Sequence, residues 1–309
     1  MISRHSMKAV ARNTGLSPHL IRVWERRYRA VSPERTATGR RLYTDDDIAK
    51  LNLLKRATQK GEAIGQVAGL TTDELNQMMS LSPGGSSDRG FATVERKPAL
   101  YLEEGLKVTR DLDSFALESI LLDASASLGQ QAFLDDVLMP LLEKTGELWE
   151  SGDLKISQEH LASAVVRSLL GSMAMAQSSE RNGPLLLTTT PAGQRHEFGA
   201  LAAAVVAASM GWRTVHLGAD LPAEEIASVV RKKGARAVAI SLVYPGDDPR
   251  LGTELRKLRR LLPENVVVVV GGRSADQYAD TLNEIEAVRT DGLADFRRRL
   301  NEIRKNPVT

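Results

Sequence analysis

The 309-residue sequence contains no cysteine. A chain without cysteine forms no disulfide, no thiolate metal site and no thioether-linked chromophore. The sequence also lacks any run of 18 or more apolar residues, and its N-terminus lacks the pattern of a signal peptide. These absences argue against a membrane span and against secretion, so we expect a cytoplasmic protein.

Charge is unevenly distributed along a chain whose overall balance is only +2. Residues 1–60 hold 14 Lys and Arg against 5 Asp and Glu, whereas the remainder holds 27 against 34. The length suits two or three domains, each with its own core. A basic module joined to an acidic body predicts a polyanionic partner for the first module alone.

The basic module has the pattern of a helix-turn-helix. A short helix is expected over Ser6–Gly15, with Val10 inward. Leu16-Ser17-Pro18 reads as a turn in which Ser17 caps a second helix ending at Tyr28. That helix directs its apolar residues to a core and its arginines outward, and such a second helix enters the major groove of DNA.

A basic hairpin follows, with Gly39 at its centre and Arg40-Arg41-Leu42-Tyr43 at its end. A hairpin of this kind can lay arginines along phosphates, as a wing does. Thr44 is expected to cap a further helix, with Asp45, Asp46 and Asp47 in its first turn.

The strings Val23-Trp24-Glu25-Arg26-Arg27-Tyr28 and Gly39-Arg40-Arg41-Leu42-Tyr43 resemble the winged helix-turn-helix of the MerR family. The alternative is a solvated basic helical domain. The resemblance covers about residues 5–78 and implies a dimer on a two-fold operator. Trp24 and Tyr28 are expected in the core, and the residues predicted to contact DNA are His19, Arg22, Arg26, Arg27, Arg40, Arg41 and Tyr43.

Composition divides the rest of the chain. Residues 1–79 form the predicted DNA-binding domain, and 80–98, rich in Ser, Pro and Gly, are expected to be a flexible linker. Residues 99–180 show helical spacing in four segments, which predicts a four-helix bundle.

Within this predicted bundle, Pro140 should kink or break the third helix. The linker interrupts any long dimerising helix, so assembly is expected in the C-terminal body as a dimer or tetramer.

Residues 181–309 alternate apolar strands with helices, which predicts a doubly wound parallel sheet of Rossmann-like type. The whole chain is thus a multidomain α and α/β protein. Polar residues and glycines gather where the strands end, and ligands of such folds bind at that edge. They are His196, Asp220, Ser241, Gly271 and Gly272.

This set resembles the cobalamin-binding fold, in which a histidine after the first strand coordinates cobalt. His196 with Gly199, Ser241 with Val243, and Gly271-Gly272 match the positions of its motifs. The resemblance implies that His196 is the axial cobalt ligand. The alternative is a histidine that merely caps a helix.

Trp149, Glu159 and His160 extend the resemblance across the bundle to light-responsive regulators of the CarH/LitR type. In that family the Trp and Glu pack against the adenosyl group of adenosylcobalamin, photolysis expels it, the oligomer changes and DNA is released. Taken singly, Trp149 could be a core residue and His160 a surface histidine.

Two positions depart from that pattern. Gln194 stands where the family has an acidic partner of the histidine, and an amide can orient the ring but contributes no charge. Glu150 stands where the light sensors commonly have a histidine, and carboxylate is a less suitable cobalt ligand.

The sequence therefore predicts a non-enzymatic, cobalamin-dependent repressor with light as its input. A second hypothesis is a MerR-type regulator that senses another tetrapyrrole or a protein antirepressor. A third is a cobalamin enzyme or methyl carrier, which lacks a substrate domain here.

Overall fold

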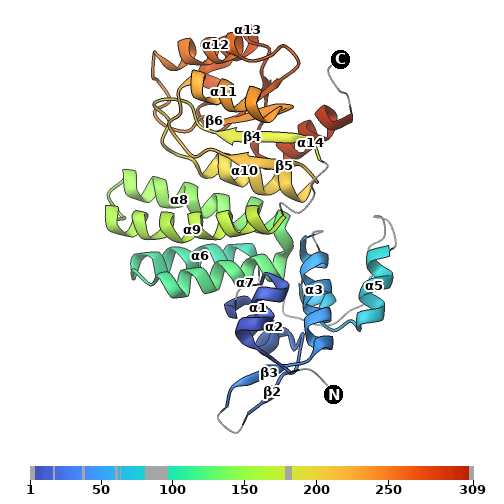
Figure 1. Ribbon diagram of the computed structural model, residues 1–309. Coiled ribbons are helices and arrows are strands. Elements are labelled where there is room, and N and C mark those ends of the chain that lie inside the picture. Colours follow the sequence, from blue (N-terminus) through green and yellow to red (C-terminus); the bar gives the residue numbers. More distant parts are fainter. Residues whose placement is uncertain are drawn as a thin grey trace. The chain divides into compact units, whose positions relative to one another are not determined.

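A computed structural model describes residues 4–16, 18–36, 39–59, 62, 64–80, 97–177 and 183–305 (Figure 1). Within a few of these segments only the backbone is described, which applies to His19 and Arg27. The chain divides into two compact units, Met1–Val166 and Arg167–Thr309. Ser17 and residues 81–96, where the helix cap and most of the linker were expected, lie outside the described residues.

The first unit begins with the predicted helix-turn-helix, formed by α1 (Met7–Thr14) and α2 (Pro18–Tyr28). After the hairpin, α3 (Asp45–Gln59) starts at Thr44, whose hydroxyl accepts from the Asp47 amide while the Asp47 carboxylate accepts from the Thr44 amide. This reciprocal cap satisfies two amides that a helix start leaves open. Thr71 and Glu74 repeat it before α5 (Thr72–Ser80), which follows the short α4 (Ile64–Val67).

The hairpin forms a small antiparallel sheet in the order β1-β3-β2. Its strands are β1 (His5–Ser6), β2 (Glu34–Arg35) and β3 (Arg41–Tyr43). Trp24 and Tyr43 are buried in the core under α1, α2 and α3, and Tyr28 packs against that core. The expectation that Trp24 and Tyr28 serve the core is confirmed.

Four helical segments follow, as the periodicity predicts: α6 (Pro98–Arg110), α7 (Ser114–Phe133), α8 (Met139–Glu150) and α9 (Ile156–Gln177). Gly129 has φ +78° and ψ 163° inside α7, a conformation that glycine tolerates and that breaks the helix there. A π-helical stretch, η1 (Leu134–Leu138), joins α7 to α8. It lies just before Pro140, which stands in the first turn of α8, where a missing N–H costs least. The predicted disturbance thus takes the form of a π-bulge.

The second unit contains a parallel sheet in the order β5-β4-β6-β7-β8. The strands are β4 (Leu185–Thr189), β5 (Arg213–His216), β6 (Ala237–Ser241), β7 (Val267–Gly271) and β8 (Val288–Arg289). Four were predicted, and β8 was missed because two residues give no periodicity. The helices are α10 (Phe198–Ser209), α11 (Ala223–Lys233), α12 (Leu251–Leu261), η2 (Ala275–Tyr278), α13 (Ala279–Glu284) and α14 (Gly292–Lys305).

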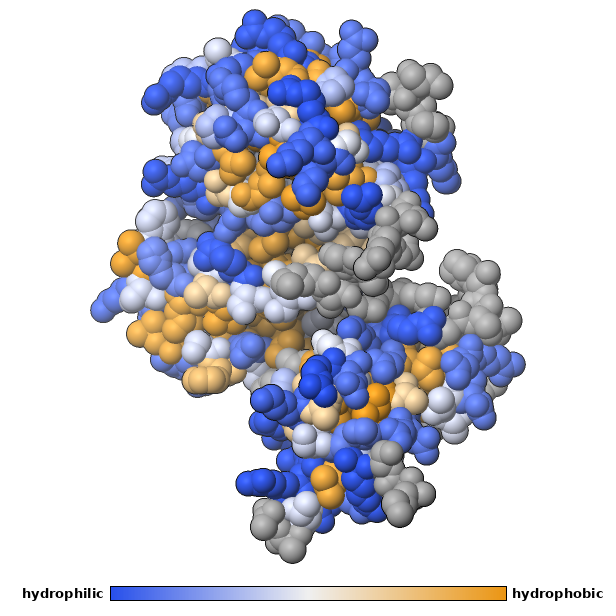
Figure 2. Space-filling model, in the orientation of Figure 1, coloured by the Kyte–Doolittle hydropathy of each residue, from blue (hydrophilic) through white to orange (hydrophobic). Residues whose placement is uncertain are grey.

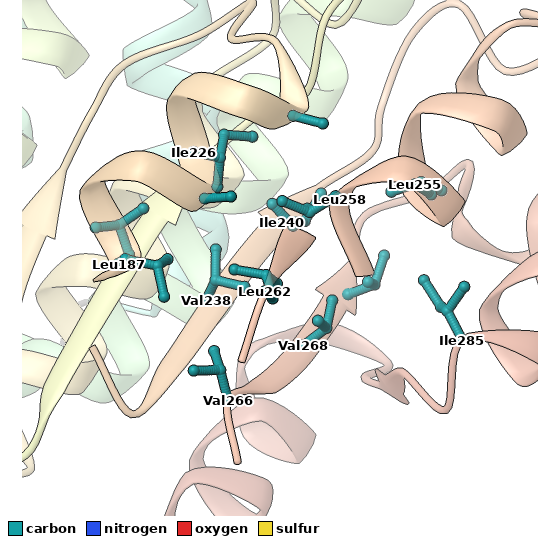
Figure 3. Packing of buried hydrophobic residues seen from close by; sticks show 14 of the residues in the cluster. Leu187, Ile226, Val238, Ile240, Leu255, Leu258, Leu262, Val266, Val268 and Ile285 are labelled. Carbon is teal, nitrogen blue, oxygen red and sulfur yellow. The ribbon is translucent and has the colours of Figure 1, made fainter. Parts of the chain in front are cut away.

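Helices cover both faces of this sheet, with α10 on one face and α11 and α12 on the other (Figure 1). Figure 3 shows Ile226 of α11 and Leu258 of α12 packed on Val238 and Ile240 of β6. Alternate strand residues belong to this cluster, and their neighbours are also buried, since every residue of β4 and β6 is buried. Burial on both faces explains why the strands are continuously apolar.

The strand order places the topological switch between β4 and β6, because the chain runs from β4 to β5 on one side and then returns to β6 on the other. Open α/β sheets bind ligands beside the carboxyl ends of the strands at this point. A ligand site is therefore expected at the loops that follow β4 and β6. Among the described residues, no helix is long and apolar enough to cross a membrane.

Candidate functional site

The loop after β4, which carries His196, is braced by the loop after β5. The Gly193 amide donates to the Asp220 carboxylate at 2.8 Å, and Thr190 Oγ1 accepts from the Asp220 amide at 2.9 Å. Pro191 and Leu221 add a parallel bridge. Asp220, predicted to bind the cofactor, has φ +64° and holds the loop that presents His196.

Gln194 is almost completely buried and ties the His196 loop to the loop after β6. Its Oε1 accepts from the amides of Val243 and Tyr244 at 2.9 and 3.1 Å, and its Nε2 donates to the Pro245 carbonyl at 2.7 Å. Among the described residues its amide bonds to this loop and not to the imidazole. The amide of Gln194 therefore joins the two loops at the topological switch.

The His196 ring contacts Tyr244 edge to face, with 5.8 Å between ring centroids and 85° between the planes. Tyr244 is 53% exposed, so this contact lies at the protein surface, beside the carboxyl edge of the sheet, and not in the core. An aromatic contact of this kind orients a ring without adding charge. The contact leaves His196 exposed beside the switch point.

Ser241 and the glycines predicted with it, Gly199, Gly271 and Gly272, are closely packed against neighbouring atoms. Ser241 is 5% exposed, and its hydroxyl has no hydrogen-bond partner among the described residues. A Cβ at Gly199 would lie 2.5 Å from that hydroxyl, and one at Gly271 would lie 2.7 Å from Thr290 Oγ1. A buried hydroxyl without a partner costs free energy, which a ligand with a polar group would recover. Among the residues predicted to bind cobalamin in this unit, Ser241 therefore has a polar group that suits such a ligand.

A polar network that the sequence did not reveal lies beside His196. The Glu197 carboxylate accepts from Arg167 Nε at 2.7 Å and lies 3.4 Å from His216 Nε2. His216 Nδ1 lies 3.0 Å from the hydroxyl of Thr188. Burial opposes ionisation of Glu197, yet Arg167 and His216 together hold its pKa below the ordinary value. Because these partners come from α9, β4 and β5, only the folded chain brings them together.

This network predicts that acid destabilises the second unit. Burial lowers the pKa of His216 below its ordinary 6.5 despite Glu197 and Thr188. As pH falls below that value, the unfolded chain takes up the proton first, so the free energy of unfolding decreases. The depressed pKa of Glu197 acts in the same direction at lower pH. Urea unfolding at pH 7.5 and 5.5 should show this loss, and His216→Gln should reduce it. An equal loss in the variant would contradict the assignment.

In the first unit, the side chains predicted from the bundle lie at the α8–α9 turn. Trp149, in the last turn of α8, is 44% exposed, so it is not a core residue. Glu150 ends that helix. Glu159, in the first turn of α9, accepts from Ser163 Oγ at 2.5 Å and lies 3.2 Å from Nδ1 of the exposed His160. An exposed tryptophan at a helix end leaves a large apolar surface available for contact.

The predicted DNA-reading face is exposed where its side chains are described. Arg22 and Arg26 on α2 and Arg40 before β3 are all exposed. Hydrophilic residues dominate the lower part of Figure 2, where α1, α2 and the hairpin lie. The side chains of His19 and Arg27 lie outside the described residues. Three exposed arginines on the second helix and the hairpin suit contacts to phosphates and base edges.

Glu25 joins the second helix to the wing, a role that the sequence did not suggest. Its carboxylate accepts from Arg41 Nε at 2.6 Å and from the Tyr43 hydroxyl at 3.3 Å, and Arg35 lies 3.9 Å away. Tyr43 is fully buried, so the expectation that it contacts DNA is replaced by a structural role. Burial, followed by the nearby Glu25 charge, raises its pKa. Arg41 is engaged by Glu25 and fixes the wing.

Replacing Glu25 by glutamine should lower operator affinity about 10-fold, because the wing loses its charged anchor to α2 while both elements keep their DNA-facing arginines. The salt dependence of binding should stay unchanged, since Glu25 neutralises no phosphate. Arg26→Ala is the matched comparison: removing a phosphate contact should lower the slope of log affinity against log salt by about one. Fluorescence anisotropy at several salt concentrations measures both. A reduced slope for Glu25→Gln would contradict the anchoring role.

Three protein families match successive parts of this chain. Residues 5–74 match the MerR HTH family regulatory protein, and residues 103–172 and 184–294 each match a B12 binding domain. The HTH-type transcriptional repressor CarH of Myxococcus xanthus is 34% identical over 295 residues, covering 95% of this chain and 97% of that protein. The repressor CarA of the same organism is 29% identical, covering 91% and 95%.

Among solved structures, the monomethylamine corrinoid protein of Methanosarcina barkeri resembles this chain with a TM-score of 0.55. It is 15% identical and covers 67% of this chain and all of its own. At that identity the likeness shows the fold alone, which agrees with a parallel-sheet domain of the cobalamin-binding type preceded by helices.

Proposed function

Because this chain belongs to the CarH-type, cobalamin-binding regulators of the MerR family, we propose that it is a light-responsive repressor whose adenosylcobalamin state sets its assembly and operator affinity. Its relatives are transcriptional repressors, and the chain is a DNA-binding regulator and not an enzyme. The observation that carries the cofactor proposal is the buried Ser241 hydroxyl without a partner among the described residues, beside Gly199 at the switch point.

In this proposal His196 holds cobalt, while Asp220 and Gln194 keep the ligand loop in place. Ser241 offers a hydrogen bond to the buried part of the cofactor. Val243 belongs to the loop that Gln194 fixes. A side chain at Gly271 would meet Thr290, and one at Gly272 would meet the backbone of Leu242. Adenosylcobalamin supplies a cobalt–carbon bond that visible light breaks.

The resemblance assigns Trp149, Glu159 and His160 to the adenosyl side of the cofactor. Trp149 is exposed and can contact a ligand at the α8–α9 turn. Glu159 accepts a hydrogen bond from Ser163, which fixes the position of its carboxylate. Glu150 replaces the histidine common in light sensors. We therefore propose that the state after illumination lacks a second histidine ligand from this position, unless His160 takes its place.

Size-exclusion chromatography with visible detection tests the proposal. Protein incubated with adenosylcobalamin in the dark should elute with the cofactor as a larger assembly, and illumination should make it smaller and weaken operator binding in a gel shift. Cyanocobalamin is the control without a photolabile alkyl group. Failure to retain adenosylcobalamin in the dark would refute the cofactor assignment. Retention with no change on illumination would refute light as the signal and favour a protein antirepressor.

A further inference from the structure

Glu197 directly follows the proposed cobalt ligand and stands at the start of α10. Its side chain is only 16% exposed, and its two carboxylate oxygens face different elements. Oε1 accepts from Arg167 Nε of α9 at 2.7 Å, while Oε2 lies 3.4 Å from His216 Nε2 at the end of β5. The residue next to His196 is therefore fixed from two sides.

The hydrogen-bond pattern extends into the sheet. A carboxylate only accepts hydrogen bonds, so His216 donates from Nε2 to Glu197. Its Nδ1 then accepts from the hydroxyl of Thr188, a fully buried residue of β4. The neutral form that burial favours for His216 suits this arrangement, since a neutral imidazole has one donor and one acceptor.

Arg167 holds two consecutive residues at the start of α10. Besides its bond to Glu197, its guanidinium carbon lies 5.3 Å from the centre of the Phe198 ring. The guanidinium is half-exposed, whereas the carboxylate is largely buried. A charged hydrogen bond is stronger than a neutral one, and removing one partner of a largely buried pair leaves the other charge without compensation.

We propose that Glu197 is a positioning residue for His196, anchored by Arg167 and His216. This inference rests on the proposed function of His196. Two residues before His196 stands the neutral amide of Gln194, which bonds to the loop after β6. The acidic residue nearest in sequence to His196 is Glu197, which directly follows it. Its anchors fix the peptide that carries the imidazole. Arg167, which anchors Glu197, lies on α9.

Glu197→Gln tests the inference. The variant keeps the size of the side chain but loses the charge that Arg167 and His216 bind. We expect cobalamin affinity to fall about 10- to 100-fold, the range for groups that orient a metal ligand. The dark spectrum should shift towards cobalamin without a histidine ligand. Glu197→Asp should restore part of both. In the double variant with Arg167→Met, the loss should be smaller than the two single losses combined, because the residues act as a pair.

The matched control is Glu284→Gln, which breaks the 2.6 Å pair with Arg256 elsewhere in the same unit and should leave affinity and spectrum unchanged. Unchanged affinity and spectrum in Glu197→Gln, together with a loss in His196→Ala, would overturn this inference alone. Unchanged binding in His196→Ala would overturn the proposed ligand itself. An equal loss in Glu284→Gln would reduce the effect to general stability and also overturn the inference.

Discussion

Replacing His196 by alanine should weaken retention of adenosylcobalamin by about 100-fold or more, because partners that merely orient a metal ligand already contribute 10- to 100-fold. The imidazole stands on a loop held by Gln194 and Asp220 through backbone contacts. Those contacts do not involve the imidazole, so the loop should keep its shape in the variant. The expected loss is therefore one of coordination and not of folding.

Titration with adenosylcobalamin in the dark, followed by visible spectra, measures this effect. Ligand-dependent assembly should disappear together with binding, while the urea midpoint of the protein without cofactor stays close to that of the parent. His5→Ala, in the DNA-binding module, is the control that removes a histidine and should retain the cofactor. Unchanged affinity and spectrum in His196→Ala would show that another group binds cobalt.

Replacing Gly272 by alanine should destabilise the second unit by about 2–6 kcal/mol, from backbone strain together with overpacking. Gly272 has φ +103°, and an added Cβ would lie 2.2 Å from the Leu242 carbonyl oxygen and 2.9 Å from the Leu242 nitrogen. Both atoms belong to the backbone next to β6, so neither can swing aside. Because folded domains are stable by only about 5–15 kcal/mol, this single methyl group could unfold the unit.

Gly234→Ala is the matched control. Gly234 has φ +63° at the end of α11, and nothing lies within 4 Å of an added Cβ. That variant bears only the left-handed backbone penalty of roughly 1–2 kcal/mol. Urea unfolding gives the two free energies, and hydrogen exchange of peptides from β6 and β7 localises the loss. Equal destabilisation by the two substitutions would show that the close approach of Gly272 to Leu242 is unimportant.

Local signals in the sequence predicted most elements of this protein. Thr44 with its acidic first turn starts α3 as expected, and the apolar runs become strands of a parallel sheet buried on both faces. These predictions succeeded because caps and periodicity depend on residues within one or two turns. β8 failed for the same reason, since two residues carry no pattern and pair only with a finished β7.

The candidate site divides in the same way. His196, Ser241 and Gly271 were proposed because His196 follows one apolar strand and the other two end theirs, and the carboxyl ends of parallel strands meet at one edge. Tyr43 was misassigned because a basic hairpin indicates exposure, whereas its side chain is buried and its hydroxyl donates to Glu25 of α2. A side chain that turns inward from a short strand is decided by packing and not by its neighbours in sequence.

By itself the sequence determined the types of domain, their order and the identity of the proposed cobalt ligand, because the motifs that indicate each consist of residues close together along the chain. Only the tertiary structure decided how that ligand is held. Gln194 bonds to a loop about fifty residues away, and Glu197 meets Arg167 and His216 from two other elements. Hydrogen bonds between distant segments depend on which strands become neighbours, and that is settled when the sheet assembles in its order β5-β4-β6-β7-β8.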